Sequence, residues 1–125
     1  MVKIYVIDTN VLIQAPYGLH CFEDNQVVLP VVVLEELDNL KKSDGEIGAN
    51  VRRAIRMLEE LRLQGDLIEG VTLPGGGTLR VELNYKDVEL PPDLLDTKSD
   101  NRILKVCMGL SKEKQLFRNY MKMNL

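Results

Sequence analysis

Acidic side chains that follow apolar segments are the residues of this chain whose positions could support chemistry. Asp8 comes directly after the β-branched segment KIYVI, and Glu35 and Glu36 lie shortly after a second apolar segment. Asp96 and Asp100 precede a third apolar region. Hard divalent cations such as Mg²⁺ and Mn²⁺ take oxygen ligands, and a bound ion can activate water for attack on a phosphodiester. These acids could therefore serve metal-dependent phosphodiester hydrolysis.

Each acid also has an ordinary structural explanation. Asp8 is suited to cap the helix that would follow it. Glu35 and Glu36 are neighbours on a predicted helix, so their side chains point about 100° apart and cannot face one site in the same way. Asp100 ends the stretch DTKSD, in which any hydroxyl or carboxylate could be the helix cap. Spacing alone leaves both explanations open.

The hydrophobic pattern predicts the elements that must position these acids. It predicts strands over residues 3–7, 26–29, 71–73 and 78–83. It predicts a short apolar turn over 11–13 and helices over 31–42, 46–64 and 99–110. The unbroken apolar strand 26–29 indicates burial on both faces, as in a parallel sheet. Strand–helix alternation favours an α/β fold, whose ligand sites lie at the carboxyl ends of strands, where Asp8 stands.

Finer patterns predict which side chains are buried. The residues expected to form one buried stripe on helix 46–64 are Ile47, Val51, Ala54, Leu58 and Leu61. The last helix is expected to bury Ile103, Leu104 and Cys107, with Met108 as a further candidate. Strict alternation over 78–83 indicates a half-exposed strand, and the preceding glycines, 75–77, indicate a hairpin loop.

Composition excludes several classes of protein. The chain has 125 residues, 45% hydrophobic and 28% charged, which suits one folded domain. No apolar run approaches the roughly 20 residues of a membrane span, and no secretory signal is recognisable, which favours a cytoplasmic protein. His20 is the only histidine, which excludes ordinary zinc sites and histidine-based triads. Cys21 and Cys107 lie far apart in apolar stretches and are expected to be reduced, buried thiols.

Charge is unevenly distributed along the chain. The formal net charge is −3, without the global basic character of many nucleic-acid-binding domains. Residues 111–125 contain four basic residues and one acid, a local +3 that leaves −6 on the rest. An acidic body is compatible with a carboxylate site but also with many inert domains.

Several separate motifs together resemble one family. The segments are VIDTNVLI, VVLPVVVLEELDNLKK, GEIGANVRRAIRMLEELR, LPGGGTLRVEL and SDNRIL. In order and spacing they resemble the PIN domain found at the N-terminus of PhoH-type ATPases, over residues 3–110. The resemblance implies a three-layer α/β fold with a central, mainly parallel sheet. It also implies an acidic Mg²⁺ or Mn²⁺ site that cleaves single-stranded RNA, and a PhoH-type ATPase domain in the full-length protein.

The resemblance assigns roles to individual residues. Its three acids fall on Asp8, Glu36 and Asp100, and Glu36 rather than Glu35 is selected because Leu37 follows it. Thr9 and Asn10 complete the strand-end motif and would orient Asp8 or a bound water.

Basic side chains on two predicted helices are candidates for contacts with RNA phosphates. They are Arg52, Arg53, Arg56 and Lys105. Solvated helix faces are the commoner explanation of such residues.

The C-terminus departs from the family pattern. PIN domains of this type continue with a strand that ends in a Thr-x-Asp-like motif and supplies a fourth acid, whereas Leu110 is followed by SKEKQLFRNYMKMNL, which lacks aspartate. We therefore divide the chain into a PIN-like domain, 1–110, which lacks its last strand, and a basic tail, 111–125. Loss of one carboxylate should weaken binding of at least a second ion. An uncovered sheet edge favours self-association into a homo-oligomer.

Three functions other than the nuclease come into consideration for this sequence. A non-catalytic RNA-binding or protein-interaction module is favoured by the missing acid and the basic tail. A phosphotransferase of the haloacid dehalogenase type needs a second aspartate two residues after the first, where Asn10 stands. A nucleotide-binding ATPase is excluded for this chain, because Gly75-Gly76-Gly77 lacks the Lys-Ser/Thr of a phosphate-binding loop.

Overall fold

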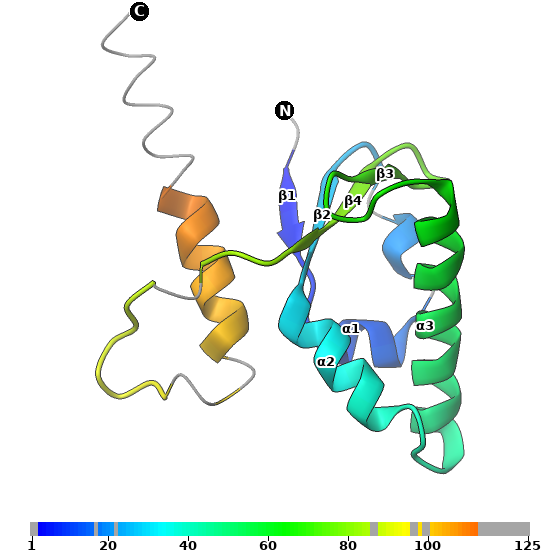
Figure 1. Cartoon of the computed structure of the whole chain (residues 1–125), viewed down its shortest axis with the longest axis horizontal. Coiled ribbons are helices and arrows are strands. Elements are labelled where there is room, and N and C mark those ends of the chain that lie inside the picture. Colours follow the sequence, from blue (N-terminus) through cyan, green and yellow to red (C-terminus); the bar gives the residue numbers. More distant parts are fainter. Residues whose placement is uncertain are drawn as a thin grey trace, which may run out of the picture. The chain divides into compact units, whose positions relative to one another are not determined.

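A computed structural model of the chain describes residues 3–16, 18–21, 23–85, 88–95, 98 and 101–112 (Figure 1). Contacts divide the chain into two compact units, Met1–Leu83 and Asn84–Leu125. The first unit contains the sheet and the helices that alternate with its strands. Among the described helices, none is both long and apolar enough to cross a membrane.

The first unit is built on a four-stranded, mainly parallel sheet. Its strands are β1 (Ile4–Val6), β2 (Gln26–Pro30), β3 (Val71–Thr72) and β4 (Thr78–Glu82). They lie in the order β1-β2-β4-β3, with β2 parallel to both β1 and β4 and with β3 antiparallel to β4. The predicted α/β class and the four predicted strands are confirmed.

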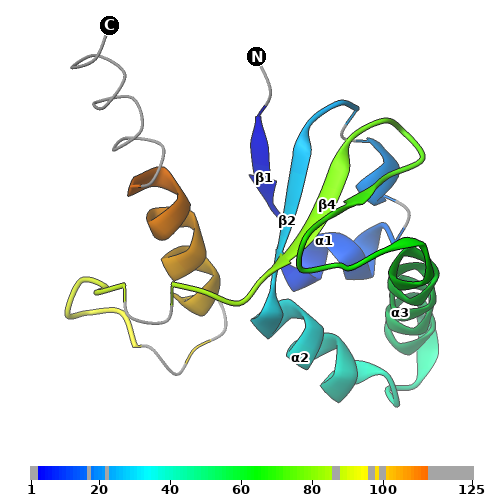
Figure 2. The same cartoon turned by 45° about the horizontal axis from the view of Figure 1, so that its top comes forward.

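Helices follow the parallel strands on one face of the sheet. They are α1 (Thr9–Gln14), the 3₁₀ turn η1 (Gly18–Cys21), α2 (Val31–Leu40) and α3 (Gly45–Gln64). The chain moves in one direction across the sheet, from β1 to β2 to β4, and right-handed crossovers then place the connecting helices on the same side. Figure 2 shows α1 between the strands and α3.

The core lies between the sheet and these helices. The three central residues of β2, Val27, Val28 and Leu29, are fully buried, which confirms the prediction for strand 26–29. The apolar stripe of α3 is buried as predicted except for Ile47, which is 54% exposed. Ile47 lies in the first turn of α3, so its helical spacing is right but little covers that end.

A close backbone approach joins α2 to α3. A Cβ atom at Gly48 would overlap the carbonyl oxygen of Ser43, so only glycine allows the connection to fold back against α3. Arg52 holds the same connection, because its Nη1 donates to the carbonyl oxygens of Lys41 at 2.9 Å and Ser43 at 3.3 Å. These contacts fix where α2 ends relative to α3.

The strands β3 and β4 form the predicted glycine hairpin. The amide of Leu73 donates to the carbonyl of Gly77 at 2.7 Å, and Gly76 has φ +101. The predicted alternation along β4 is wrong at its end, because Glu82 is only 5% exposed. Its carboxylate accepts from Arg80 Nη1 at 2.7 Å, and this ion pair offsets the cost of burying the charge.

The second unit contains a helix over residues 101–112. Gly109 lies where a Cβ atom would collide with the ring of Tyr85, a residue with φ +73. Ile103 is buried as predicted, whereas the prediction for Leu104 is wrong, since that side chain is 37% exposed.

Other predictions about the end of the chain concern residues of which the structure describes only a part. The prediction that Cys107 and Met108 are buried is wrong, since both are half-buried. Cys107 is free, and its partial burial raises the pKa of its thiol. The predicted absence of a last strand concerns residues 113–125, which lie outside the described residues.

Candidate active site

The carboxyl ends of three parallel strands meet at one edge of the sheet. Val6 of β1 pairs with Val28 of β2, and the amide of Ile7 donates to the Val28 carbonyl at 3.0 Å. Asp8 therefore leaves the sheet at the level of Pro30, which pairs with Glu82 of β4. This edge is where an α/β sheet places its ligands.

Asp8 is held at this edge by the helix that follows it. It is the N-cap of α1, with extended backbone angles, and its Oδ1 accepts from the amide of Val11 at 3.0 Å. The capping explanation is thus correct for one carboxylate oxygen. The second oxygen makes no hydrogen bond with the described residues, which leaves it available to a ligand.

Thr9 and Asn10 differ in exposure. Thr9 is 5% exposed, and its Oγ1 is buried without a hydrogen-bond partner in the part of the chain that is described. A buried hydroxyl without a partner costs about 1–3 kcal/mol, so such atoms call for a ligand or water. Asn10 is exposed. Thr9 has the more constrained position of the two.

Glu36 is the glutamate of α2 that turns inward. It is half-buried, and its Oε1 is fully buried without a partner among the described residues, whereas Glu35 is exposed. The helix starts directly after Pro30, so Glu36 lies on the element that leaves the same sheet edge as Asp8. The two glutamates thus differ in burial, and the assignment of Glu36 to the site stays a prediction.

The third predicted acid falls outside the described residues. Neither Asp100 nor the alternative Asp96 is described. The helix of the second unit begins at residue 101, directly after Asp100. Within the described residues, no group of three His, Cys, Asp or Glu side chains is placed to hold a metal ion. Asp8 and Glu36 therefore form the described part of the predicted ligand set.

The available donors fit a hard divalent cation. Glu36 Oε1 and Thr9 Oγ1 are buried oxygens without described partners, and Asp8 has one uncommitted carboxylate oxygen. Mg²⁺ and Mn²⁺ prefer carboxylate, hydroxyl and water oxygens over nitrogen or sulfur.

Glu82 is a buried acid at this edge that the sequence did not single out. It belongs to the same face of β4 as Arg80, two residues earlier, and the ion pair with Arg80 holds it there. Its position at the carboxyl end of a parallel strand was the available signal, but the alternating pattern had marked this strand as half-exposed.

The four basic side chains that were predicted to bind phosphate differ in exposure and in their hydrogen bonds. Arg52 is committed to the backbone of the α2–α3 connection, and Lys105 is only 8% exposed. Arg53 and Arg56 are exposed on α3, and Arg53 Nη1 donates to Asn50 Oδ1 at 2.9 Å. Arg53 and Arg56 thus remain as accessible cations.

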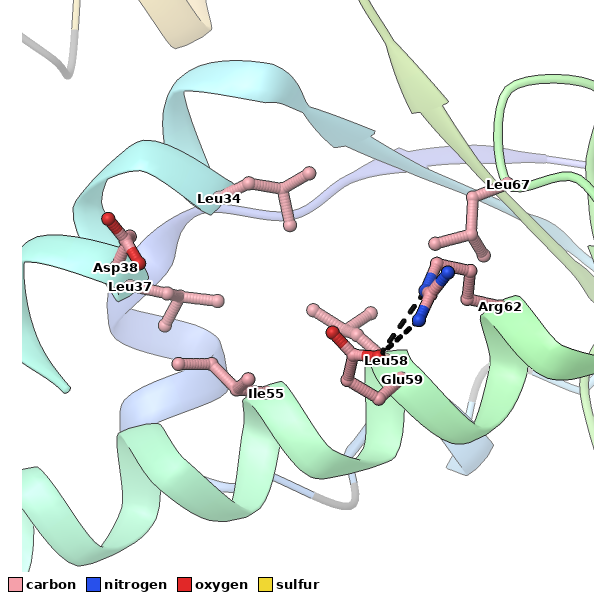
Figure 3. A pocket seen from close by; sticks show the side chains of 8 residues that line it. All are labelled: Leu34, Leu37, Asp38, Ile55, Leu58, Glu59, Arg62 and Leu67. Carbon is pink, nitrogen blue, oxygen red and sulfur yellow. Dashed lines mark hydrogen bonds and ion pairs between the residues drawn. The ribbon is translucent and has the colours of Figure 1, made fainter.

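An apolar groove of about 230 Å³ lies between α2 and α3. The apolar side chains that line it in Figure 3 are Leu34, Leu37, Ile55, Leu58 and Leu67. Arg62 lies at its border, paired with Glu59. Asp38 also lines the groove, and two residues along a helix are about 200° apart, so Glu36 points to nearly the opposite side of α2. The groove is separate from the acidic edge.

A family profile described as the PIN domain matches residues 5–122, nearly the whole chain. The chain belongs to the PIN domain family. PIN domains are commonly nucleases, and the family match includes both Asp8 and Glu36. It extends to residue 122 and so includes most of the stretch 111–125.

Three similar proteins are much longer than this chain. It is 46% identical to Protein PhoH2 of Bacillus subtilis over 120 residues, 95% of this chain and 27% of that protein. It is 38% identical to Protein PhoH2 of Thermobispora bispora and of Mycolicibacterium smegmatis, over 89% and 90% of this chain and 26% of each relative. The PIN domain thus spans about a quarter of the length of these curated relatives. No solved structure matches it.

Proposed function

We propose that this PIN domain is a Mg²⁺- or Mn²⁺-dependent endoribonuclease that cleaves single-stranded RNA. The observation that supports the proposal is a pair of buried oxygens without described partners, on the two helices that follow β1 and β2. The two oxygens are Glu36 Oε1 on α2 and Thr9 Oγ1 on α1, and Thr9 directly follows Asp8, which leaves the sheet two residues after β1 ends. Oxygens desolvated in this way favour a ligand that supplies positive charge or hydrogen-bond donors.

In this proposal Asp8, Glu36 and Asp100 hold the divalent ion. When bound, such an ion polarises the phosphate and lowers the pKa of water. The hydrogen bond from the Val11 amide holds one oxygen of the Asp8 carboxylate, and the second oxygen would bind the ion. Thr9 Oγ1 would donate a hydrogen bond to the Asp8 carboxylate or to water and thereby orient it. Asn10 is exposed and could assist in the same way from the solvent side.

Hydrolysis forms one bond from the water oxygen to phosphorus and breaks one bond from phosphorus to a sugar oxygen. A proton leaves the attacking water, and the departing sugar oxygen gains one. In the proposed mechanism, carboxylates at this edge accept hydrogen bonds from the water and keep it directed at phosphorus.

RNA cleavage by matched variants tests the proposal. Residues that only orient a metal ligand already matter by roughly 10- to 100-fold, so Asp8→Asn and Glu36→Gln should each lower the cleavage rate by about 100-fold or more. Glu35→Gln is the matched control, because Glu35 is the exposed neighbour on α2. The rate is measured on a labelled single-stranded RNA with Mg²⁺, with Mn²⁺ and with EDTA. Equal, metal-independent rates for all proteins would rule out the nuclease.

A non-catalytic RNA-binding or protein-interaction module is the second candidate function. The apolar groove between α2 and α3, on another side of α2 from Glu36, is the observation that favours it. RNA binding that survives Asp8→Asn, without cleavage by either protein, would identify the module.

The longer relatives suggest the setting in which the domain works. Because the chain spans about a quarter of each PhoH2 protein, we propose that it acts beside a PhoH-type ATPase domain of the same polypeptide. Self-association of the isolated domain stays a prediction, which sedimentation or light scattering can measure.

A further inference from the structure

A side-chain amide joins the helix that carries Asp8 to an exposed arginine. Asn50 of α3 donates from Nδ2 to the carbonyl of Ile13 at 2.9 Å. Ile13 lies in the last turn of α1, where helix carbonyls lack partners within their own helix. Asn50 thus fixes α3 against the end of the short helix that Asp8 begins.

The other end of the same amide orients Arg53. Asn50 Oδ1 accepts from Arg53 Nη1 at 2.9 Å. Only one orientation of the amide satisfies both bonds, because its nitrogen must face a carbonyl and its oxygen a guanidinium. Arg53 is exposed, and Nη2 and Nε make no hydrogen bond with described residues. These donors are free to bind an anion in the planar geometry that suits phosphate.

The other arginines of α3 are not both exposed with free donors and linked to α1 by hydrogen bonds. Arg52 donates to two backbone carbonyls of the α2–α3 connection. Arg62 is paired with Glu59 at 2.8 Å and lies nine residues after Arg53, which is about 180° around the helix. Arg56 is exposed, but no contact with the described residues ties it to α1. Among the arginines of α3, which is described in full, Arg53 alone is held by a bond chain that leads to the helix of Asp8.

We propose that Arg53, positioned by Asn50, binds a phosphate of the RNA strand that is cut, at a position other than the bond that is cut; this rests on the proposed nuclease function. Asp8 caps the beginning of α1, whereas Asn50 binds a carbonyl in its last turn. Arg53 is tied to that far end of the helix, so the phosphate that it contacts is not the one that is attacked. The contact fixes the register of RNA on the site without reading its bases.

The first test is the salt dependence of RNA binding by Arg53→Gln. Binding of a fluorescent single-stranded RNA is measured in the Asp8→Asn background, which prevents cleavage. Loss of one phosphate contact should lower the slope of log affinity against log salt by about 0.7. Affinity should fall about 5-fold at low salt, in keeping with one exposed ionic contact. Arg62→Gln is the matched control and should leave both quantities unchanged.

The second test locates the phosphate. Single neutral methylphosphonates are placed along the RNA, and the affinity of each RNA is measured for the Asp8→Asn protein with and without the further change Arg53→Gln. At the contacted position the two losses should not add, since each removes the same interaction. That position should differ from the cleavage site mapped with the active protein. Additive losses at every position would overturn the proposal.

Asn50→Ala supplies a check on the positioning role. It should lower affinity less than Arg53→Gln and should abolish the position-specific effect of the methylphosphonate, because Arg53 keeps its charge but loses its orientation. If the proposed nuclease function is wrong, the protein will not cleave RNA. The salt dependence of RNA binding will still test the Arg53 contact in that case. Cleavage with identical slopes for Arg53→Gln and the parent would overturn only the Arg53 contact.

Discussion

At the residue scale, the two oxygens of Asp8 have different tasks. Oδ1 accepts from the amide of Val11, while the second oxygen has no partner in the described part of the chain. Capping and metal binding therefore do not exclude each other, although the sequence presents them as alternatives. The cap restricts the motion of the side chain, and a carboxylate that is already ordered binds an ion with less loss of entropy.

Substitutions at Asp8 can separate the two tasks. Asn keeps an oxygen for the amide of Val11, so Asp8→Asn should retain the stability of the parent within about 0.5 kcal/mol but should lose cleavage. Asp8→Ala removes the cap as well and should lower the free energy of unfolding by about 1 kcal/mol. Urea unfolding followed by circular dichroism measures both. Equal stability of the Ala and Asn variants would show that the cap contributes nothing.

At the element scale, the connection between α2 and α3 depends on Gly48. Glycine in a helix ordinarily costs about 0.5–1 kcal/mol relative to alanine, so Gly→Ala usually stabilises. Here the added Cβ would overlap the Ser43 carbonyl, to which Arg52 also donates. The backbone clash opposes the helix propensity and should exceed it.

Gly48→Ala should therefore destabilise the protein. We expect a loss of about 1–3 kcal/mol, since overpacking against a backbone atom forces the connection to move. Gly18→Ala is the control, because a Cβ there would meet only Ala15 Cβ at an ordinary 3.5 Å. Thermal unfolding of both variants measures the difference. Stabilisation by Gly48→Ala would contradict the close approach.

Periodicity predicted the elements well but the burial of single residues less well. It predicted β2 and the stripe of α3 because each has one unambiguous pattern over several residues. It missed the exposure of Ile47, which helical spacing assigns to the core but which the fold leaves at an uncovered helix end. It missed the burial of Glu82, which depends on a partner, Arg80, that only the folded strand places beside it.

At the scale of the whole molecule, the sequence predicts the sheet edge at which the strands end. It does not predict whether the acidic side chains come together there. Strand order and register place the chain after β1 level with the end of β2, and this follows from local patterns and the handedness of crossovers. The choice of Glu36 over Glu35 depended on the resemblance to PIN domains. Whether three acids meet depends on packing between residues far apart in the chain, which cannot be predicted from the spacing of motifs. Asp100, the third acid, is outside the described residues.

A metal ion that binds the folded site should stabilise the whole molecule. Binding to the folded state alone adds about 2.7 kcal/mol when the free ion reaches about 100 times its Kd. Mg²⁺ or Mn²⁺ should therefore raise the Tm in a concentration-dependent way, and Glu36→Gln should suppress the rise because it removes the carboxylate whose Oε1 is buried without a described partner. Glu35→Gln should preserve it. Differential scanning calorimetry at constant ionic strength measures the shift, since screening by added salt would otherwise alter surface charges in all variants alike. The same shift in Glu36→Gln as in the parent would place the ion elsewhere, even if the parent cleaves RNA.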